Sequence, residues 1–195
     1  MYFKTFFTKQ FIIYVLKFIL IFCICYYGSL LVEGITAVGG YYSGFIDHNF
    51  NYIKLLRTSL LDTSKWVLSS FGYQTYRESQ FVLRMKDGIA VKLVYSCLGL
   101  GVMSFWVAFI IANAGSWIKK AKWILGGLLL IWCINVARIS LLLVAINRQW
   151  KTFFSVDHHT LFNIAAYSAI FVMIYFFSRS DKDLPEEDPL RSGVE

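Results

Sequence analysis

Four long apolar stretches dominate the sequence and limit the folds that the chain can adopt. They cover approximately residues 11–32, 93–113, 123–146 and 161–177. A helix needs about 20 apolar residues to cross the hydrocarbon core of a bilayer, with a lower limit of roughly 17. The first three stretches reach that length and the fourth reaches the lower limit. The pattern predicts an all-α membrane protein with about four transmembrane helices.

The composition supports one membrane domain, which we expect to cover residues 1–178. Charged residues make up 16% of the chain, against about 25% in an average soluble domain. The formal net charge is +7, but the basic residues flank apolar stretches, where they orient helices and contact anionic lipid. We therefore expect the lipid bilayer as a partner and no nucleic-acid binding. The first stretch ends without a small-x-small cleavage site, so we interpret it as a retained span and not as a signal peptide.

Basic residues beside the stretches predict how the protein is oriented. Three groups fall on one side of a four-span protein: Lys4 and Lys9, then Lys119, Lys120 and Lys122 in a short turn, then Arg179 and Lys182. The positive-inside rule makes that side cytoplasmic. We therefore expect a multi-pass protein of the cytoplasmic (inner) membrane. Its charged tail, residues 179–195, would lie in the cytoplasm and residues 34–92 would be extracytoplasmic.

The extracytoplasmic segment contains two recognisable patterns. Residues 51–72 have the periodicity of an amphipathic helix on the membrane surface, which we expect to be broken near residues 62–64. Residues 81–85 and 89–97 alternate as two short strands around an Asp87-Gly88 turn, which predicts a β-hairpin. The second strand leads directly into Cys97 and the second apolar stretch.

Cys97 is a candidate nucleophile because it stands where the second span is expected to begin. Unsatisfied amides at a helix N-terminus favour a thiolate, and Gly99 and Gly101 allow a peptide backbone to approach the sulfur. The alternative is a buried structural cysteine. The other cysteines, Cys23, Cys25 and Cys133, lie inside apolar stretches as small hydrophobic residues. No spacing fits a zinc site or a disulfide framework, so we expect no metal site.

Arg138 lies inside the third stretch, which is otherwise almost wholly apolar. A guanidinium at membrane depth costs roughly 2.5–3.5 kcal/mol on insertion scales, and such residues usually face the protein interior. Asn135, three residues earlier, projects from the same helix face. About 15 residues, or roughly 22 Å, separate Arg138 from the cytoplasmic end of the stretch, which places it in the half of the bilayer nearer Cys97. The alternative is a structural arginine paired with a carbonyl or with Asp157.

His158 and His159 stand just before the fourth stretch, on the side expected for Cys97. Asp157 could cap the following helix and hydrogen-bond an imidazole. The alternative is a pair of histidines at the membrane interface. The D-H-H string is similar to a palmitoyltransferase signature, but Thr160 follows in place of cysteine and no cysteine-rich loop is present. We therefore exclude that family.

Taken in order, these motifs resemble the exosortase/archaeosortase family. The motifs are Cys97-Leu98-Gly99 at the start of a span, Asn135 and Arg138 in N-x-x-R, and Asp157-His158 before the last span. The strand-turn-strand before the cysteine also resembles that family, and the resemblance covers roughly residues 80–178. The chain is shorter than the larger members, and His159 doubles the histidine. The resemblance implies a polytopic membrane cysteine enzyme, with no metal and no organic cofactor.

The resemblance also implies the reaction. Family members are thought to cleave a C-terminal sorting signal of exported proteins and to pass the new end to a surface anchor. Here Cys97 would attack the peptide carbonyl, His158 or His159 would act as base, and Arg138 would stabilise the oxyanion or the thiolate. Substrates would carry one C-terminal transmembrane segment, and hydrolysis and transfer both remain open. The competing hypothesis is a non-enzymatic membrane scaffold or assembly partner of an export or polysaccharide system.

Overall fold

The computed structural model describes residues 9–37, 41–86, 88–148 and 158–182, with side chains of residues 164–180 in the last range. The elements are α1 (Lys9–Thr36), α2 (Gly44–Asn49), α3 (Tyr52–Ser70), β1 (Thr75–Ser79), β2 (Val82–Met85), β3 (Ala90–Lys92), a 3₁₀ helix η1 (Tyr95–Cys97), α4 (Leu100–Ala112), α5 (Trp117–Asn147) and α6 (His158–Lys182). Helices make up 76% of the described residues, so the prediction of a mainly helical protein is confirmed.

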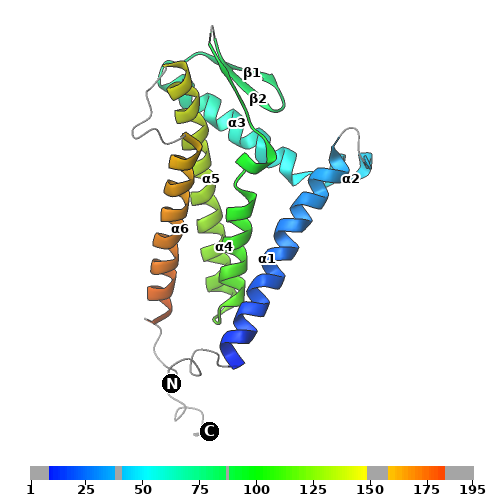
Figure 1. Cartoon of the computed structure of the whole chain (residues 1–195), viewed down its shortest axis with the longest axis vertical. Helices are drawn as coiled ribbons and strands as arrows, with labels where there is room; N and C mark the ends of the chain where they lie inside the picture. The colour runs from blue at the N-terminus through cyan, green and yellow to red at the C-terminus, as the bar shows by residue number, and fades with distance from the viewer. Residues whose placement is uncertain (1–8, 38–40, 87, 149–157, 183–195) are drawn as a thin grey trace.

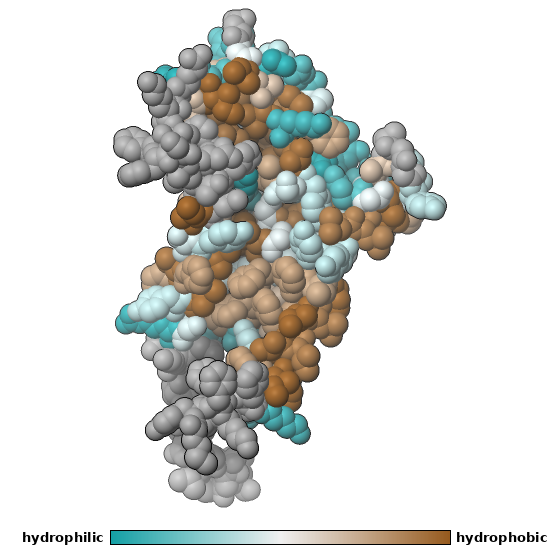
Figure 2. Space-filling model, viewed as in Figure 1, coloured by the Kyte–Doolittle hydropathy of each residue, from teal (hydrophilic) through white to brown (hydrophobic). Residues whose placement is uncertain are grey.

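Four helices run along the long axis of the molecule, and α3 and the small sheet lie together at one end, here called the sheet end (Figure 1). Along the long axis α1 packs against α4, α4 against α5, and α5 against α6. Hydrophobic residues cover much of the helical part, whereas hydrophilic residues gather toward the sheet end (Figure 2). This distribution fits a helical part surrounded by lipid and a sheet end in water.

Two of the four predicted spans have the length and composition to cross a bilayer. Among the described residues these are α1 and α5, with 28 and 31 residues. The other two apolar helical segments, Leu100–Ala112 and Ile164–Ser180, are shorter. The structure therefore supports a membrane protein with two full-length apolar helices, and it does not confirm four.

Residues 93–97 belong both to the predicted second span and to the predicted second strand, and the helical prediction is wrong for them, because the chain stays extended beyond β3. Leu93 N–H donates to Phe81 O at 2.7 Å, which continues the sheet. The 3₁₀ helix η1 follows, and Gly99 then adopts a left-handed conformation with φ of +76°. Helix α4 begins only at Leu100, and its 13 residues span about 20 Å at 1.5 Å per residue.

Helix α3 is amphipathic as predicted, but the expected break within it is wrong. Its buried face includes Ile53, Leu60, Leu61 and Leu68, all at most 2% exposed. The helix is continuous from Tyr52 to Ser70, because polar residues at the expected break find partners on opposite sides of it. Asp62 accepts from Arg77 at 3.0 Å on the outer side, whereas the buried Ser64 hydroxyl donates to Val136 O of α5 at 3.4 Å.

The predicted hairpin is present and is part of a larger sheet. Strands β2 and β3 pair antiparallel, with Leu83 opposite Val91. An additional strand, β1, pairs with β2, which gives the order β1-β2-β3. The sequence of β1, Thr75 to Ser79, offers little hydrophobic alternation, so its pattern did not predict a strand. Leu83 and Val91 join the buried face of α3 and Leu143 of α5 in one hydrophobic core.

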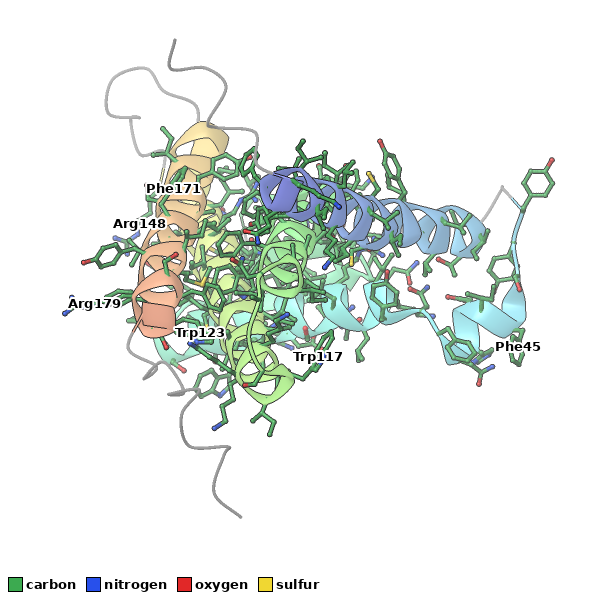
Figure 3. All side chains as sticks on the ribbon, turned by 90° about the horizontal axis from the view of Figure 1, so that it is seen from below. Phe45, Trp117, Trp123, Arg148, Phe171 and Arg179 are labelled. Carbon is green, nitrogen blue, oxygen red and sulfur yellow. The ribbon has the colours of Figure 1, made fainter. Side chains whose placement is uncertain are left out.

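The lysines predicted to fill a turn lie instead in the first turns of α5, which starts at Trp117. Lys119 Nζ donates to Ser180 O of α6 at 2.7 Å, and Lys120 Nζ donates to Ile111 O of α4 at 3.2 Å. Cations near the C-terminus of a helix hydrogen-bond its last carbonyls and interact favourably with the helix dipole. The view from below in Figure 3 shows this end of the bundle, with Trp117 and Trp123 on α5. The end with these lysines is opposite the sheet end.

Helices α4 and α5 approach each other closely at Gly127. A Cβ atom on Gly127 would overlap the indole of Trp106, whose Nε1 donates to Trp123 O at 3.0 Å. The absence of a side chain at Gly127 therefore permits this close helix packing. Gly126 has no neighbouring side chain in that position.

Candidate functional site

The structure brings two of the predicted site residues together at the sheet end of the bundle. Arg138 Nη2 on α5 lies 3.7 Å from Cys97 Sγ, which is on η1. Both side chains are partly buried. The sequence predicted Cys97 at the N-terminus of the second span. In the structure Gly99 is the N-cap of α4, so Cys97 precedes that helix. A guanidinium and not a helix terminus is therefore the positive group observed next to the sulfur.

The Cys-Leu-Gly motif has a separate structural role at each position. Leu98 is fully buried and anchors the turn in the hydrophobic core. Gly99 has a positive φ, which side chains with a Cβ adopt only at a cost. A Cβ on Gly99 would also overlap the carboxamide of Asn135. The motif therefore forms a tight turn that directs the Cys97 side chain toward Arg138.

Asn135 connects this turn to α5. It is only 6% exposed, and its Nδ2 donates to Leu98 O at 3.2 Å. Since Asn135 and Arg138 are three residues apart on one helix face, a single stretch of α5 holds the turn and supplies the guanidinium. The predicted supporting residue thus lies where it can set the position of Cys97.

Two cavities lie beside this site and share Arg138 as a lining residue. The larger, of about 760 Å³, is lined mainly by apolar side chains from α1, α4, α5 and α6, and its polar lining residues include Tyr95, Ser96, Asn135 and Arg138. The smaller, of about 200 Å³, lies between β3 and α5 and includes Cys97 and Arg138. Arg138 lines both cavities, whereas Cys97 lines only the smaller one.

Gly101 lines the larger cavity. A Cβ on Gly101 would meet Tyr26 of α1 at 3.6 Å, an ordinary contact distance. Of the two glycines that follow the cysteine, only Gly99 therefore has a position that excludes a side chain.

The predicted histidines lie in the first turn of α6, which begins at His158, and not before the helix. Their side chains and the whole of Asp157 lie outside the described residues. Helix α6 ends at the lysine end of the bundle, where Ser180 O contacts Lys119. It therefore begins nearer the sheet end of the bundle (Figure 1).

Two polar anchors beside the site were not recognised from the sequence. Arg57 of α3 is 5% exposed and its Nη2 lies 2.7 Å from Glu33 Oε1 at the end of α1. Asn147 of α5 receives Ile89 N–H at 2.7 Å and donates to Ile89 O at 3.3 Å, which holds β3 against the helix. A possible signal for the first was the single acidic residue, Glu33, beside the first apolar stretch.

Comparison with known proteins agrees with this arrangement. The family model described as transmembrane exosortase matches residues 47–176, which is two thirds of the chain. The match covers α3, the sheet, the Cys97 turn, α4, α5 and most of α6. No curated protein matches the chain, and no solved structure matches it. With a model of this extent placed over the residues that form the site, the chain belongs to the transmembrane exosortase family.

Proposed function

We propose that the protein is a membrane cysteine protease or transpeptidase that cleaves a C-terminal sorting signal of exported proteins through a thioester. The observation that carries the proposal is the 3.7 Å contact between Cys97 Sγ and Arg138 Nη2, with Arg138 lining two cavities. Family membership supports a peptidase or transpeptidase role in general. The thiol and the guanidinium supply a nucleophile and a cationic donor for acyl transfer.

In the proposed reaction, the Cys97 sulfur forms a bond to the carbonyl carbon of the scissile peptide. The thiol proton moves to His158, or to His159, and from there to the nitrogen of the leaving amine as the C–N bond breaks. Arg138 donates to the oxyanion of the tetrahedral intermediate, and Asp157 orients the imidazole. Water or an acceptor amine then attacks the thioester and restores the thiol.

The larger cavity supports a substrate whose C-terminal segment is apolar. Helices α1 and α6 contribute aromatic residues to its wall: Phe22, Tyr26, Tyr167 and Phe171. Its volume of about 760 Å³ is within the usual range of ligand pockets, roughly 300–1,000 Å³. A transmembrane segment that enters laterally could place apolar side chains there while its preceding residues reach Cys97.

The distribution of charge supports a site on the extracytoplasmic side. Lys119 and Lys120 lie at the end of the bundle opposite the sheet. The positive-inside rule makes that end cytoplasmic. The sheet, the η1 turn and Arg138 then face the other side of the membrane, where an exported protein would be processed.

The test is a comparison of Cys97→Ser with Cys133→Ser. Cells that carry only Cys97→Ser should accumulate unprocessed precursors with C-terminal apolar segments, because a serine hydroxyl is far less ionised than a thiol. Cys133 is exposed on α5, so Cys133→Ser should process normally. Membrane proteomics would measure both. Normal processing by Cys97→Ser at a wild-type protein level would refute the nucleophile assignment.

A further inference from the structure

We propose that the substrate residues just before the scissile bond bind as an additional strand on the open edge of β3, parallel to it. This inference rests on the proposed function. It specifies how the part of the substrate outside the membrane is held, which the identity of the nucleophile does not decide.

One edge of β3 is open among the described residues. The strand order leaves β3 at the side of the sheet. Leu93 N–H donates to Phe81 O, and Met85 N–H donates to Ile89 O, so the odd-numbered residues of this segment pair with β2. Successive residues of a strand direct their backbone groups to opposite sides. Ala90 and Lys92 therefore direct theirs away from β2, where no described group bonds to them.

The smaller cavity lies along this edge and leads to the reactive pair. Its walls are Ala90 to Leu93 on one side and Ile139, Leu142 and Ile146 of α5 on the other. Four residues of strand cover about 13 Å, and the stretch of α5 from Arg138 to Ile146 covers about 12 Å. Cys97 and Arg138 also line it. A short extended peptide in this groove would present its next carbonyl to the sulfur.

The open edge is held in place before any peptide binds. Asn147 bonds both backbone groups of Ile89, and the Asn147 carboxamide occupies the space that a Cβ on Gly88 would need. Leu83 and Val91 fix the other side of the hairpin in the core. A rigid edge loses little conformational freedom on binding, so main-chain hydrogen bonds contribute more of their energy to affinity.

The direction of the bound strand follows from the chain path. Strand β3 runs from the hairpin turn toward η1 and α4, and so toward the helical part (Figure 1). A substrate with a C-terminal transmembrane segment passes in the same sense, from outside into the bilayer. The two chains therefore run parallel, and the apolar segment that follows the scissile bond continues toward the larger cavity, which Arg138 also lines.

The first test removes one main-chain donor from the open edge. The probe is a precursor that accumulates in cells with Cys97→Ser. Lys92→Pro removes the outward N–H, whereas Lys92→Ala removes only the side chain. Thr75→Pro is the matched control on the far edge, because Thr75 is opposite Met85, whose N–H points to β3. Lys92→Pro should process the precursor about tenfold more slowly than Lys92→Ala, the equivalent of one lost hydrogen bond.

The second test does not depend on whether the proline variant folds. In a Cys97→Ser protein with serine at the other three cysteine positions, Ala90→Cys or Lys92→Cys is paired with single cysteines scanned along the precursor. Disulfide cross-linking should alternate with a period of two residues. The best position should move two residues toward the substrate C-terminus between the Ala90 and Lys92 variants.

The outcomes separate the strand proposal from the proposed function. If no precursor accumulates with Cys97→Ser, both are wrong. If precursors accumulate but cross-linking has no two-residue period, or Lys92→Pro processes as fast as Lys92→Ala, the strand proposal alone is overturned. A shift toward the substrate N-terminus overturns the parallel direction.

Discussion

Gly99→Ala tests whether the turn before α4 has the conformation on which the site depends. An alanine at φ of +76° costs about 1–2 kcal/mol in a left-handed conformation. Its Cβ also overlaps the Asn135 carboxamide, which must move and lose its 3.2 Å bond to Leu98 O. A buried carbonyl without its donor costs about 1–3 kcal/mol. The variant should therefore be destabilised by about 2–5 kcal/mol.

The double variant Gly99→Ala/Asn135→Ala tests whether residues 99 and 135 are in contact. Asn135→Ala alone should cost about 1–3 kcal/mol, because it removes the same hydrogen bond. In the double variant that bond is lost only once and the new methyl group has room. The double variant should therefore be within about 1 kcal/mol of Gly99→Ala alone, a clear departure from additivity for residues in contact.

The assay is unfolding in mixed detergent micelles, with the rate of Cys97 thiol labelling as a local readout. Gly101→Ala is the control from the same motif, since its Cβ would make an ordinary contact with Tyr26. It should be neutral or slightly stabilising, as for glycine to alanine within a helix. Additive costs at positions 99 and 135, or a Gly99→Ala variant as stable as Gly101→Ala, would refute the turn geometry.

Three further predictions concern the guanidinium, the topology and the polar anchor. Arg138→Lys keeps a positive charge but loses the planar donor fork, so turnover should fall about 10²–10³-fold with little change in detergent melting temperature; near-normal turnover would exclude Arg138 from the reaction. A cysteine at Ser116, in the α4–α5 loop, should be labelled only from the cytoplasmic side, and labelling from outside would contradict the proposed orientation. Glu33→Gln should lower the free energy of unfolding by about 1.5–3 kcal/mol, because Arg57 is buried and bonded to Glu33. Asp62→Asn should lower it by less than about 1 kcal/mol, since Asp62 and Arg77 form an exposed pair. Equal unfolding free energies of the two variants would exclude Arg57 as a structural anchor.

Part of this arrangement was predictable because it depends on local patterns. Apolar length predicted α1 and α5, and alternation around Gly88 predicted the hairpin. The spacing of Asn135 and Arg138 placed both on one helix face, and the structure directs both toward the Cys97 turn. The resemblance that these motifs suggested is confirmed by the family match.

The remainder depends on contacts between distant segments, which local patterns do not encode. The apolar run from Leu93 has the composition of a helix, but Leu93 pairs with Phe81 in the sheet and Gly99 turns the backbone. Strand β1 forms through its pairing with β2. The role of Asn147 depends on its bonds to Ile89, 58 residues away. The assignment of His158 as base remains a prediction.

The close approach of α4 and α5 has a consequence for how the reactive pair can be altered from a distance. The Trp106 indole occupies the space left by the missing side chain of Gly127 and is bonded to Trp123 O, so the two helices are in direct contact at this point. Cys97 leads into one helix and Arg138 lies on the other. Gly127 is 11 residues from Arg138, or about 16 Å along α5. We expect added bulk at position 127 to push the two helices apart at this point and so to change the distance between sulfur and guanidinium farther along the bundle.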